Sequence, residues 1–254
     1  MRFRLSLSSE PLLAPFLCRL AVLAALALGS TTAVLAAPFE NTMAQRMQAC
    51  MACHGLQGRA GPDGYYPRIA GKPAGYLYHQ LLSFRDGRRH YALMTGMVDL
   101  LSDAYLMEIA QYFSSIDAPY PPPATAAQIG TTPELLRQGQ RLVTQGDPAH
   151  GIPACVQCHG QALTGVAPDI PGLLGLPRDY LNAQMGSFRT GQRRAQAPDC
   201  MATVAQRLSL ADVNAVASWL ATRPLPADTH PASALSAPLP LPCGSVSDAN
   251  EARR

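Results

Sequence analysis

Apolar residues recur along this chain at the three- and four-residue spacing of amphipathic helices, and they do so in two separate stretches. Each stretch contains an earlier and a later helical segment with one apolar stripe. The earlier stripes are Leu77, Leu81 and Phe84, and Leu181, Met185 and Phe188; the later ones are Leu106, Ile109 and Phe113, and Val213, Val216 and Leu220. The alternation typical of strands is missing, so the pattern predicts an all-α fold.

Capping residues mark where several of these helices should begin. Ser102 and Ser209 stand at N-cap positions before the later stripes, and Asp212 completes a Ser-x-x-Asp capping pattern in the second stretch. Thr132 is followed by a proline and a glutamate, which is typical of a helix start. A further helix is therefore expected at the head of the second stretch.

The two stretches are copies of one unit, because many residues recur at nearly the same offset. The first set, at an offset of 105, is Cys50, Cys53 and His54 with Cys155, Cys158 and His159. The second set, at 104, is Pro67, Gly71, Tyr76, Gln80, Phe84, Arg85 and Gly87 with Pro171, Gly175, Tyr180, Gln184, Phe188, Arg189 and Gly191. The third set, at 107, is Met94, Leu101 and Ser102 with Met201, Leu208 and Ser209.

This duplication predicts five segments in the chain of 254 residues. Residues 1–36 are expected to be a signal peptide, 37–117 a first domain, 118–127 a proline-rich linker, 128–223 a second domain, and 224–254 a Pro/Ala-rich tail. The prolines of the linker favour an extended, stiff connection that spaces the domains. The tail lacks apolar periodicity and is expected to be irregular or disordered.

The N-terminus has the layout of a secretory signal, with Arg2 and Arg4 before an apolar run from Leu20 to Leu28 and small residues up to Ala36. We expect cleavage after Ala36 and export to the periplasm. An uncleaved membrane anchor is the alternative, although the run is shorter than the ~20 apolar residues of a membrane span.

The charge balance argues against a nucleic-acid partner. The chain has 20 Lys and Arg residues against 17 Asp and Glu residues, so its field is weak and mixed in sign. All of the basic residues except Lys72 are arginine.

The motif Cys-x-x-Cys-His, which attaches c-type haem, occurs twice. Two thiols three residues apart at the start of a helix can meet the two vinyl groups of one porphyrin, and the next side chain then points its imidazole at the iron. The sequence thus predicts two covalent haem c groups, held by Cys50 and Cys53 and by Cys155 and Cys158. A redox dithiol or half of a zinc site is the weaker interpretation.

Axial iron ligands are expected from His54 and His159 on one face of each haem and from methionine on the other. The repeat selects Met94 and Met201, because each lies eight residues before the N-cap serine. Both are expected in loops, whereas Met97 and the remaining methionines are expected to pack in the core.

Two arginines at matched positions, Arg85 and Arg189, are candidate partners of the haem propionates, since a planar guanidinium suits a carboxylate. A solvated helix end is the alternative for both. Tyr76 and Tyr180 are further candidates, with plain aromatic packing as their alternative.

Two cysteines remain when four are used by haem and Cys18 leaves with the signal peptide. We expect Cys200 and Cys243 to form a disulfide that pins the tail to the loop of Met201, with free thiols as the alternative. Cys200 could also displace the neighbouring Met201 from the iron, because thiolate is a strong ligand of haem iron.

Residues 40–223 resemble the dihaem cytochrome c4 family. The most telling segments are Met94–Met97 followed by Leu101–Asp103, Ile109–Phe113, and Gly151–Cys155 at the entry to the second haem motif. The resemblance implies two tandem class I cytochrome c domains, each wrapped around one haem with His/Met ligands. The chain departs from the family in its long tail, in Cys200 and Cys243, and in glycine-poor loops before Met94.

Electron transfer is the function that this resemblance implies, since irons capped on both faces offer no open site for a substrate. The expected partners are redox proteins: a membrane oxidase, a dehydrogenase or a cytochrome complex, with room for peripheral membrane association. Two alternatives stay open. One is a dihaem enzyme, such as a peroxidase or a thiosulfate-oxidising cytochrome, and the other is a subunit of a dehydrogenase complex in which the tail docks a partner.

Overall fold

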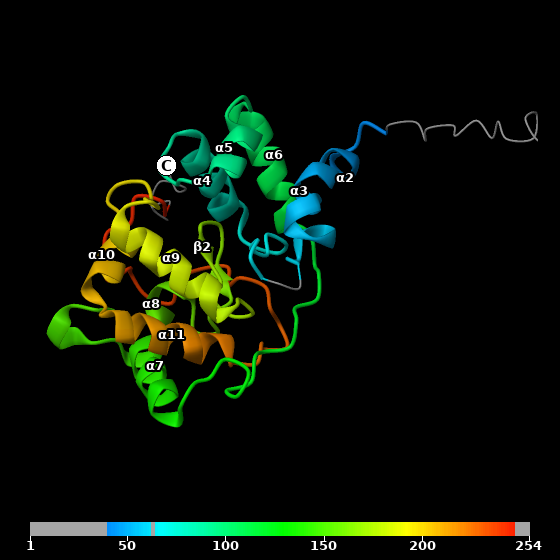
Figure 1. The fold of residues 1–254 in the computed structure, drawn as a ribbon. Coiled ribbons are helices and arrows are strands. Elements are labelled where there is room, and N and C mark those ends of the chain that lie inside the picture. Colours follow the sequence, from blue (N-terminus) through cyan, green and yellow to red (C-terminus); the bar gives the residue numbers. More distant parts are fainter. Residues whose placement is uncertain (1–39, 62–63, 247–254) are drawn as a thin grey trace, which may run out of the picture. The chain divides into compact units, whose positions relative to one another are not determined.

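Two helical repeats follow one another along the chain, and a segment without helices connects them (Figure 1). The computed structural model describes residues 40–61 and 64–246, so the predicted signal peptide lies outside the described residues. The first repeat contains α2 (Met43–Arg46), α3 (Gln48–His54), the 3-10 turn η1 (Leu56–Gly58), α4 (Ala74–Arg85), α5 (Ala92–Val98) and α6 (Asp103–Ser114). The second contains α7 (Pro133–Gln145), the 3-10 turn η2 (Pro148–His150), α8 (Cys155–His159), α9 (Arg178–Thr190), α10 (Cys200–Arg207) and α11 (Leu210–Ala221).

One short hairpin is added to this helical architecture. Strands β1 (Gly165–Val166) and β2 (Ile170–Pro171) pair antiparallel in the second repeat. Two residues are too few to show an alternating pattern, so these strands could not be predicted from the sequence. The all-α prediction is confirmed, and none of the helices among the described residues is long and apolar enough to cross a membrane.

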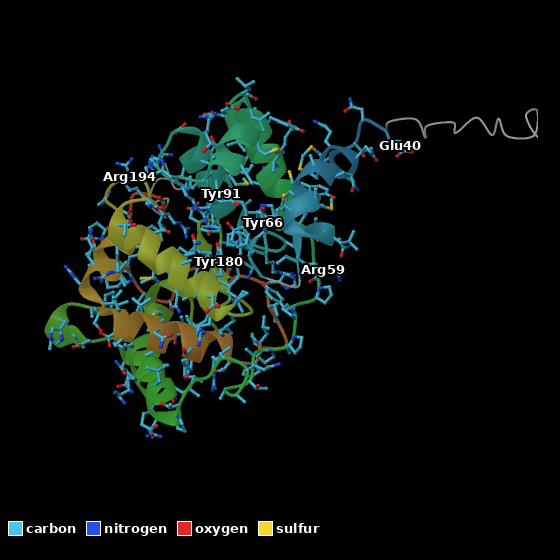
Figure 2. The ribbon with its side chains drawn as sticks, in the orientation of Figure 1. Glu40, Arg59, Tyr66, Tyr91, Tyr180 and Arg194 are labelled. Carbon is cyan, nitrogen blue, oxygen red and sulfur yellow. A yellow bond between two sulfur atoms is a disulfide. The ribbon has the colours of Figure 1, made fainter. Side chains whose placement is uncertain are left out.

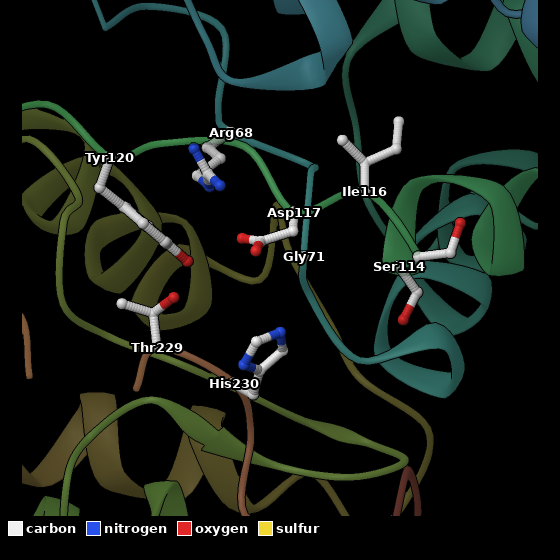
Figure 3. A pocket seen from close by; sticks show the side chains of 9 residues that line it. Arg68, Gly71, Ser114, Ile116, Asp117, Tyr120, Thr229 and His230 are labelled. Carbon is white, nitrogen blue, oxygen red and sulfur yellow. The ribbon is translucent and has the colours of Figure 1, made fainter. Parts of the chain in front are cut away.

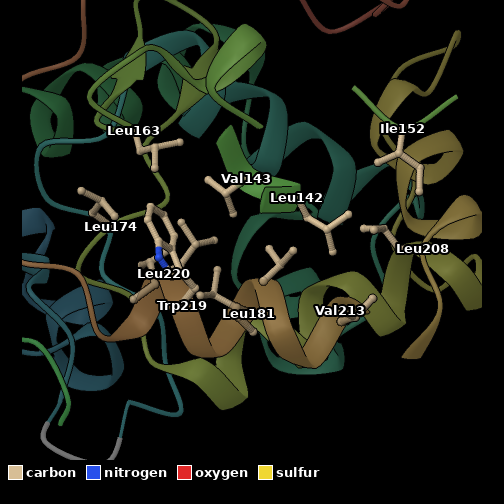
Figure 4. Packing of buried hydrophobic residues seen from close by; sticks show 13 residues of the cluster. Leu142, Val143, Ile152, Leu163, Leu174, Leu181, Leu208, Val213, Trp219 and Leu220 are labelled. Carbon is tan, nitrogen blue, oxygen red and sulfur yellow. The ribbon is translucent and has the colours of Figure 1, made fainter. Parts of the chain in front are cut away.

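The predicted apolar stripes form the cores of the two repeats. In the first repeat, Leu77 and Phe84 of α4 pack with Leu106 and Phe113 of α6, and all four are buried. In the second repeat, the stripes of α9 and α11 meet residues of α7 in one apolar cluster (Figure 4). A cluster of this kind supplies most of the free energy that holds the helices together.

Helices α7 and α11 approach one another at Gly139. A Cβ atom at this position would lie 2.1 Å from the carbonyl oxygen of Ala215 and 2.7 Å from Cβ of Trp219. Only glycine therefore permits this approach, which brings Val143 and Trp219 into the same core.

The predicted helix starts are confirmed. The Ser102 hydroxyl accepts a hydrogen bond from the backbone N–H of Tyr105 (3.3 Å), and Thr132 caps α7 through the N–H of Leu135 (3.3 Å). Ser209 and Asp212 form a reciprocal capping box at the start of α11, with both backbone contacts at 3.1 Å. These bonds satisfy N–H groups that a helix start leaves unpaired.

The linker between the repeats is fixed by Arg68 of the first repeat. Its guanidinium donates to the carbonyl oxygens of Ala118 and Pro119 and stacks on the ring of Tyr120, 3.6 Å from the centroid. The same ring also packs against Gly175 of the second repeat. The connection is therefore anchored on both sides. The repeats are not spaced apart by it, because they also contact each other directly, as in the backbone hydrogen bond from Arg194 to Arg88 (2.7 Å).

The tail follows an irregular path from residue 224 to residue 246 and is attached to the second repeat at two places. Ala232 exchanges backbone hydrogen bonds with Gly165 (2.9 Å) and Ala167 (2.8 Å). Farther on, Cys243 forms the expected disulfide with Cys200 at the start of α10. The tail is thus pinned beside Met201.

Candidate haem sites

Each Cys-x-x-Cys-His motif lies on a short helix that ends directly after the histidine. Cys50, Cys53 and His54 lie on α3. Their counterparts in the second repeat all lie on α8, which begins at Cys155 and ends at His159. Gly55 and Gly160 stop the two helices with φ angles of 74° and 82°. Such angles favour glycine, so the chain can turn away directly after each histidine.

The ring orientation of both histidines is set by the same contact. Nδ1 of His54 lies 2.8 Å from the carbonyl oxygen of Pro67, and Nδ1 of His159 lies 2.8 Å from that of Pro171. A carbonyl oxygen only accepts, so Nδ1 must carry the hydrogen and Nε2 keeps its lone pair. This is the tautomer that a metal-binding imidazole requires.

Burial keeps both imidazoles neutral. His54 and His159 are 7% and 8% exposed, and burial lowers the pKa of each. The nearby charge of Arg89 lowers the pKa of His54 further, and that of Lys72 lowers the pKa of His159. Neutral imidazole is the ligating form, so both side chains are ready to bind iron near neutral pH.

None of the four motif cysteines forms a disulfide, although Cys200 and Cys243 do. Burial raises the pKa of Cys155 to about 12 and raises the pKa values of Cys50 and Cys158. Two thiols beside a correctly oriented imidazole, twice over, fit the covalent attachment of haem. A bound haem would supply the iron that takes up and releases a single electron at each site.

The expectation that both candidate axial methionines lie in loops is wrong. Met94 lies on α5 and Met201 is the second residue of α10. Each helix is short, with 7 and 8 residues, and the side chain of Asp199 caps α10, a cap that the sequence analysis overlooked. Both methionines are partly buried, and their ligation of iron stays a prediction. Met97, expected in the core, is 49% exposed.

The two arginines that were proposed as propionate partners have protein partners. Arg85 donates to the carbonyl oxygen of Leu101 (3.1 Å) and to Oδ1 of Asp103 (2.6 Å), while Arg189 donates to the carbonyl oxygens of Ala205 (2.7 Å) and Leu208. They therefore tie each middle helix to the start of the final helix. Their contact with propionates stays a prediction.

A second pair of arginines, missed in the sequence, joins the two repeats. The backbones of Arg89 and Arg193 pair as an antiparallel bridge, and each guanidinium stacks on a phenylalanine of its own repeat. Both also donate to the side-chain oxygens of two glutamines, Gln80 and Gln184, at 2.8–3.1 Å. The offset of 104 that relates Arg85 to Arg189 also relates Arg89 to Arg193, so the repeat itself was the signal that could have found them.

The two candidate tyrosines lie in the same interface, and Tyr180 is labelled in Figure 2. The Tyr76 hydroxyl accepts a hydrogen bond from Arg193 (3.2 Å), and Arg89 bonds with the Tyr180 hydroxyl. Burial alone would raise the pKa of Tyr76, but the charges of Arg193, Arg89 and Lys72 lower it to about 8. The lowered pKa of Tyr76 therefore indicates a positive interior, whereas burial and the neighbouring Tyr76 raise the pKa of Tyr180.

That positive interior is the feature that fits haem propionates. Arg193 and Lys72 are 8% and 7% exposed, and Arg89 is partly buried beside them. Within residues 40–61 and 64–246, none of the three forms an ion pair with a carboxylate. Buried charges are normally paired, so this cluster suits the carboxylates that two haems would bring.

A separate cavity of about 170 Å³ lies between the linker and the tail (Figure 3). Arg68, Asp117, Tyr120 and His230 are among its lining residues, and none of the motif cysteines or histidines reaches it. It is therefore distinct from the haem sites.

Comparison with known proteins agrees with this geometry. The cytochrome c family model matches residues 136–224. The chain is 41% identical to the thiosulfate dehydrogenase electron acceptor of Thiomonas intermedia over 182 residues, which is 70% of this chain and 79% of that protein. It is 33% identical to cytochrome c4 of Pseudomonas aeruginosa, covering 77% of this chain and 94% of the relative.

A solved structure gives the same result for the fold. Reduced recombinant cytochrome c4 from Pseudomonas stutzeri superposes with a TM-score of 0.58 at 32% identity, over 70% of this chain and 94% of that one. Together with the duplicated haem motif, these likenesses show that the chain belongs to the cytochrome c4 family of dihaem c-type cytochromes, which carry electrons.

Proposed function

We propose that this protein accepts electrons from a thiosulfate-oxidising dehydrogenase in the periplasm and passes them to a terminal oxidase or another acceptor. The proposal is carried by the 41% identity to a thiosulfate dehydrogenase electron acceptor. The likeness extends over 182 residues, more than either predicted domain contains, so it includes both repeats. Oxidative coupling of two thiosulfate ions releases two electrons, a number that two one-electron haems can hold.

The role of carrier is favoured over that of enzyme by the state of Cys200. It was the one residue that suggested a labile iron ligand, and its sulfur is bonded to Cys243. The only free cysteines among the described residues are the four of the haem motifs. Cys200 therefore has no thiolate that could bind the iron, which supports an iron without a labile cysteine ligand.

The disulfide also supports the periplasmic location, because such bonds persist in oxidising compartments. The signal-like N-terminus gives the same expectation. Mass spectrometry of the protein from a periplasmic extract should find a chain that begins at Ala37; a chain retained in the membrane with its first 36 residues would contradict this part of the proposal.

A stopped-flow experiment tests the donor. The oxidised protein is mixed with thiosulfate and a catalytic amount of a purified thiosulfate-oxidising dehydrogenase, and haem reduction is followed by absorbance. We expect both haems to be reduced with the dehydrogenase and neither with thiosulfate alone. Reduction by thiosulfate alone, with formation of tetrathionate, would favour the enzyme alternative. No reduction in either mixture would reject this donor.

A further inference from the structure

Lys72, the single lysine of the chain, occupies an unusual place in the structure. It lies directly before Pro73, which caps α4, and it is 7% exposed. Within the part of the chain that the structure describes, its ammonium group has no hydrogen bond and no ion pair. The Lys72 side chain is largely buried and its ammonium group has no protein partner among these residues, so such a site is expected to receive an anion.

The charged neighbours of Lys72 do not supply that anion. Burial lowers the pKa of Lys72, and the charges of Arg68 and Arg193 lower it further, with only the Tyr76 hydroxyl acting in the opposite direction. Arg68 is already bound to the linker, and Arg193 to Gln80 and Gln184. Asp169 is a buried carboxylate beside the start of α4, but its Oδ1 lies 3.9 Å from Nδ1 of His79, and among the described residues it forms no ion pair with Lys72.

The position of Lys72 relates it to the haem site of the other repeat. The backbone N–H of Tyr76 donates to the carbonyl oxygen of Pro168 (3.2 Å), and a Cβ at Gly75 would lie 2.1 Å from Oδ1 of Asp169. The start of α4 thus rests on the segment that leads into β2, whose Pro171 orients His159. Lys72 lies three residues before Gly75, at the entry to α4 and beside the segment that orients His159.

The equivalent position in the second repeat makes this arrangement asymmetric. The offset of 104 relates Lys72 to Leu176, which is buried in the apolar core of its own repeat. The second repeat therefore has no cation at the position that matches Lys72.

We propose that Lys72 of the first repeat binds a propionate of the haem attached to the second repeat and raises the reduction potential of that haem. Reduction adds an electron, and a nearby positive charge stabilises it. At an effective dielectric constant of about 20, a charge roughly 10 Å from the iron changes the equilibrium by about a factor of ten. For a one-electron couple, a factor of ten is about 59 mV. The potential of the second haem is then set in part by contact between the repeats.

A spectropotentiometric titration of the dihaem protein tests this assignment. Lys72→Met removes the charge at similar length, Lys72→Gln does so with a polar group, and Lys72→Arg keeps it. Arg141→Met is the matched control, because it removes an exposed cation from the second repeat. The two haems are distinguished by electron paramagnetic resonance, with Met201→Ala identifying the signal of the second haem.

We expect Lys72→Met and Lys72→Gln to lower the reduction potential of the second haem by about 59 mV, which is a tenfold change in its reduction equilibrium. The potential of the first haem should stay nearly unchanged in both variants. Lys72→Arg should retain the wild-type potentials. The Arg141→Met control should titrate as wild type. Equal shifts of both haems, no shift of either, or a Lys72→Arg variant that behaves like Lys72→Met would overturn the proposal. If Lys72→Met fails to acquire haem, Lys72→Gln decides between these outcomes.

Discussion

The two repeats have the same haem-binding motif, but the structure around the motif is more strongly stabilised in the second repeat than in the first. In the second repeat, α7 has 13 residues and packs closely on α11, a capping box starts α11, and a disulfide holds the tail against α10. In the first repeat, the helix before the motif is interrupted at Met47, and Ser102 caps α6 without a reciprocal partner. Duplication has thus preserved the groups that bind haem, while the supporting structure has diverged.

The interface between the repeats has remained symmetric in contrast to the scaffolds. Arg89 and Arg193 contact the same two glutamines and stack on equivalent phenylalanines. Lys72 is the exception, because its counterpart is the apolar Leu176. The interface is therefore symmetric in its arginines and glutamines and asymmetric at Lys72, the residue that we propose acts on one haem only.

The largest expected effect comes from removing the axial methionines. Met94→Ala should abolish the methionine–iron band of the first haem only, and Met201→Ala that of the second only. The potential of the affected haem should fall by a few tenths of a volt, within the ~0.8 V range that axial ligands span. Redox titration and absorption spectra provide the measurement, with Met97→Ala as a control on the same helix as Met94. A band lost in the control instead would show that the wrong methionine was assigned.

The disulfide should stabilise the second repeat and leave the first unchanged. Replacing Cys200 and Cys243 by serine opens a link between residues 43 positions apart, which is expected to cost roughly 4 kcal/mol in the free energy of unfolding. Denaturant unfolding followed by Trp219, the single tryptophan, reports this repeat directly. An unchanged midpoint would mean that the tail adds nothing to the second repeat.

The symmetric arginines should have equal effects. Arg89→Met and Arg193→Met each remove charged hydrogen bonds across the interface, and each is expected to weaken contact between the repeats by about 2–4 kcal/mol. The two substitutions should not be additive, since they disrupt one network. Hydrogen exchange at the paired backbone of residues 88–90 and 192–194 measures the loss. A much larger effect of one variant would contradict the symmetric account.

The smallest expected effect concerns the helix caps. Ser209→Ala breaks a reciprocal box and should cost about 1–2 kcal/mol, whereas Ser102→Ala removes one bond and should cost about 1 kcal/mol or less. Thermal unfolding of both variants, with the haems attached, gives the comparison. Equal losses would indicate that the reciprocal contact from Asp212 contributes little.

Much of this structure could be predicted from the sequence because each motif occurs twice, so a feature found in one repeat could be checked at the matching position of the other. The motifs, the apolar stripes and the N-cap serines recur at fixed offsets, and the structure places them as expected. Helices α5 and α10 were missed because 7 or 8 residues are too few for a clear apolar period.

The role of the interface arginines could be recognised only in the three-dimensional structure. Arg85 and Arg189 were selected because they occupy matched positions and a guanidinium suits a carboxylate, yet they donate to backbone carbonyl oxygens within their own repeats. Arg89 and Arg193 are four residues farther along, in turns where sequence gives no indication of burial. Lys72 was similarly unremarkable until its burial and its lack of a carboxylate partner were visible.

The most direct test of a closed dihaem electron carrier is an absorption spectrum of the purified protein, oxidised, reduced, and reduced under carbon monoxide, together with a haem count per chain. We expect two low-spin haems per chain and a reduced spectrum that carbon monoxide leaves unchanged. A haem that readily binds carbon monoxide would reveal an open coordination site, contradict the assignment of two methionine-capped irons, and favour an enzyme.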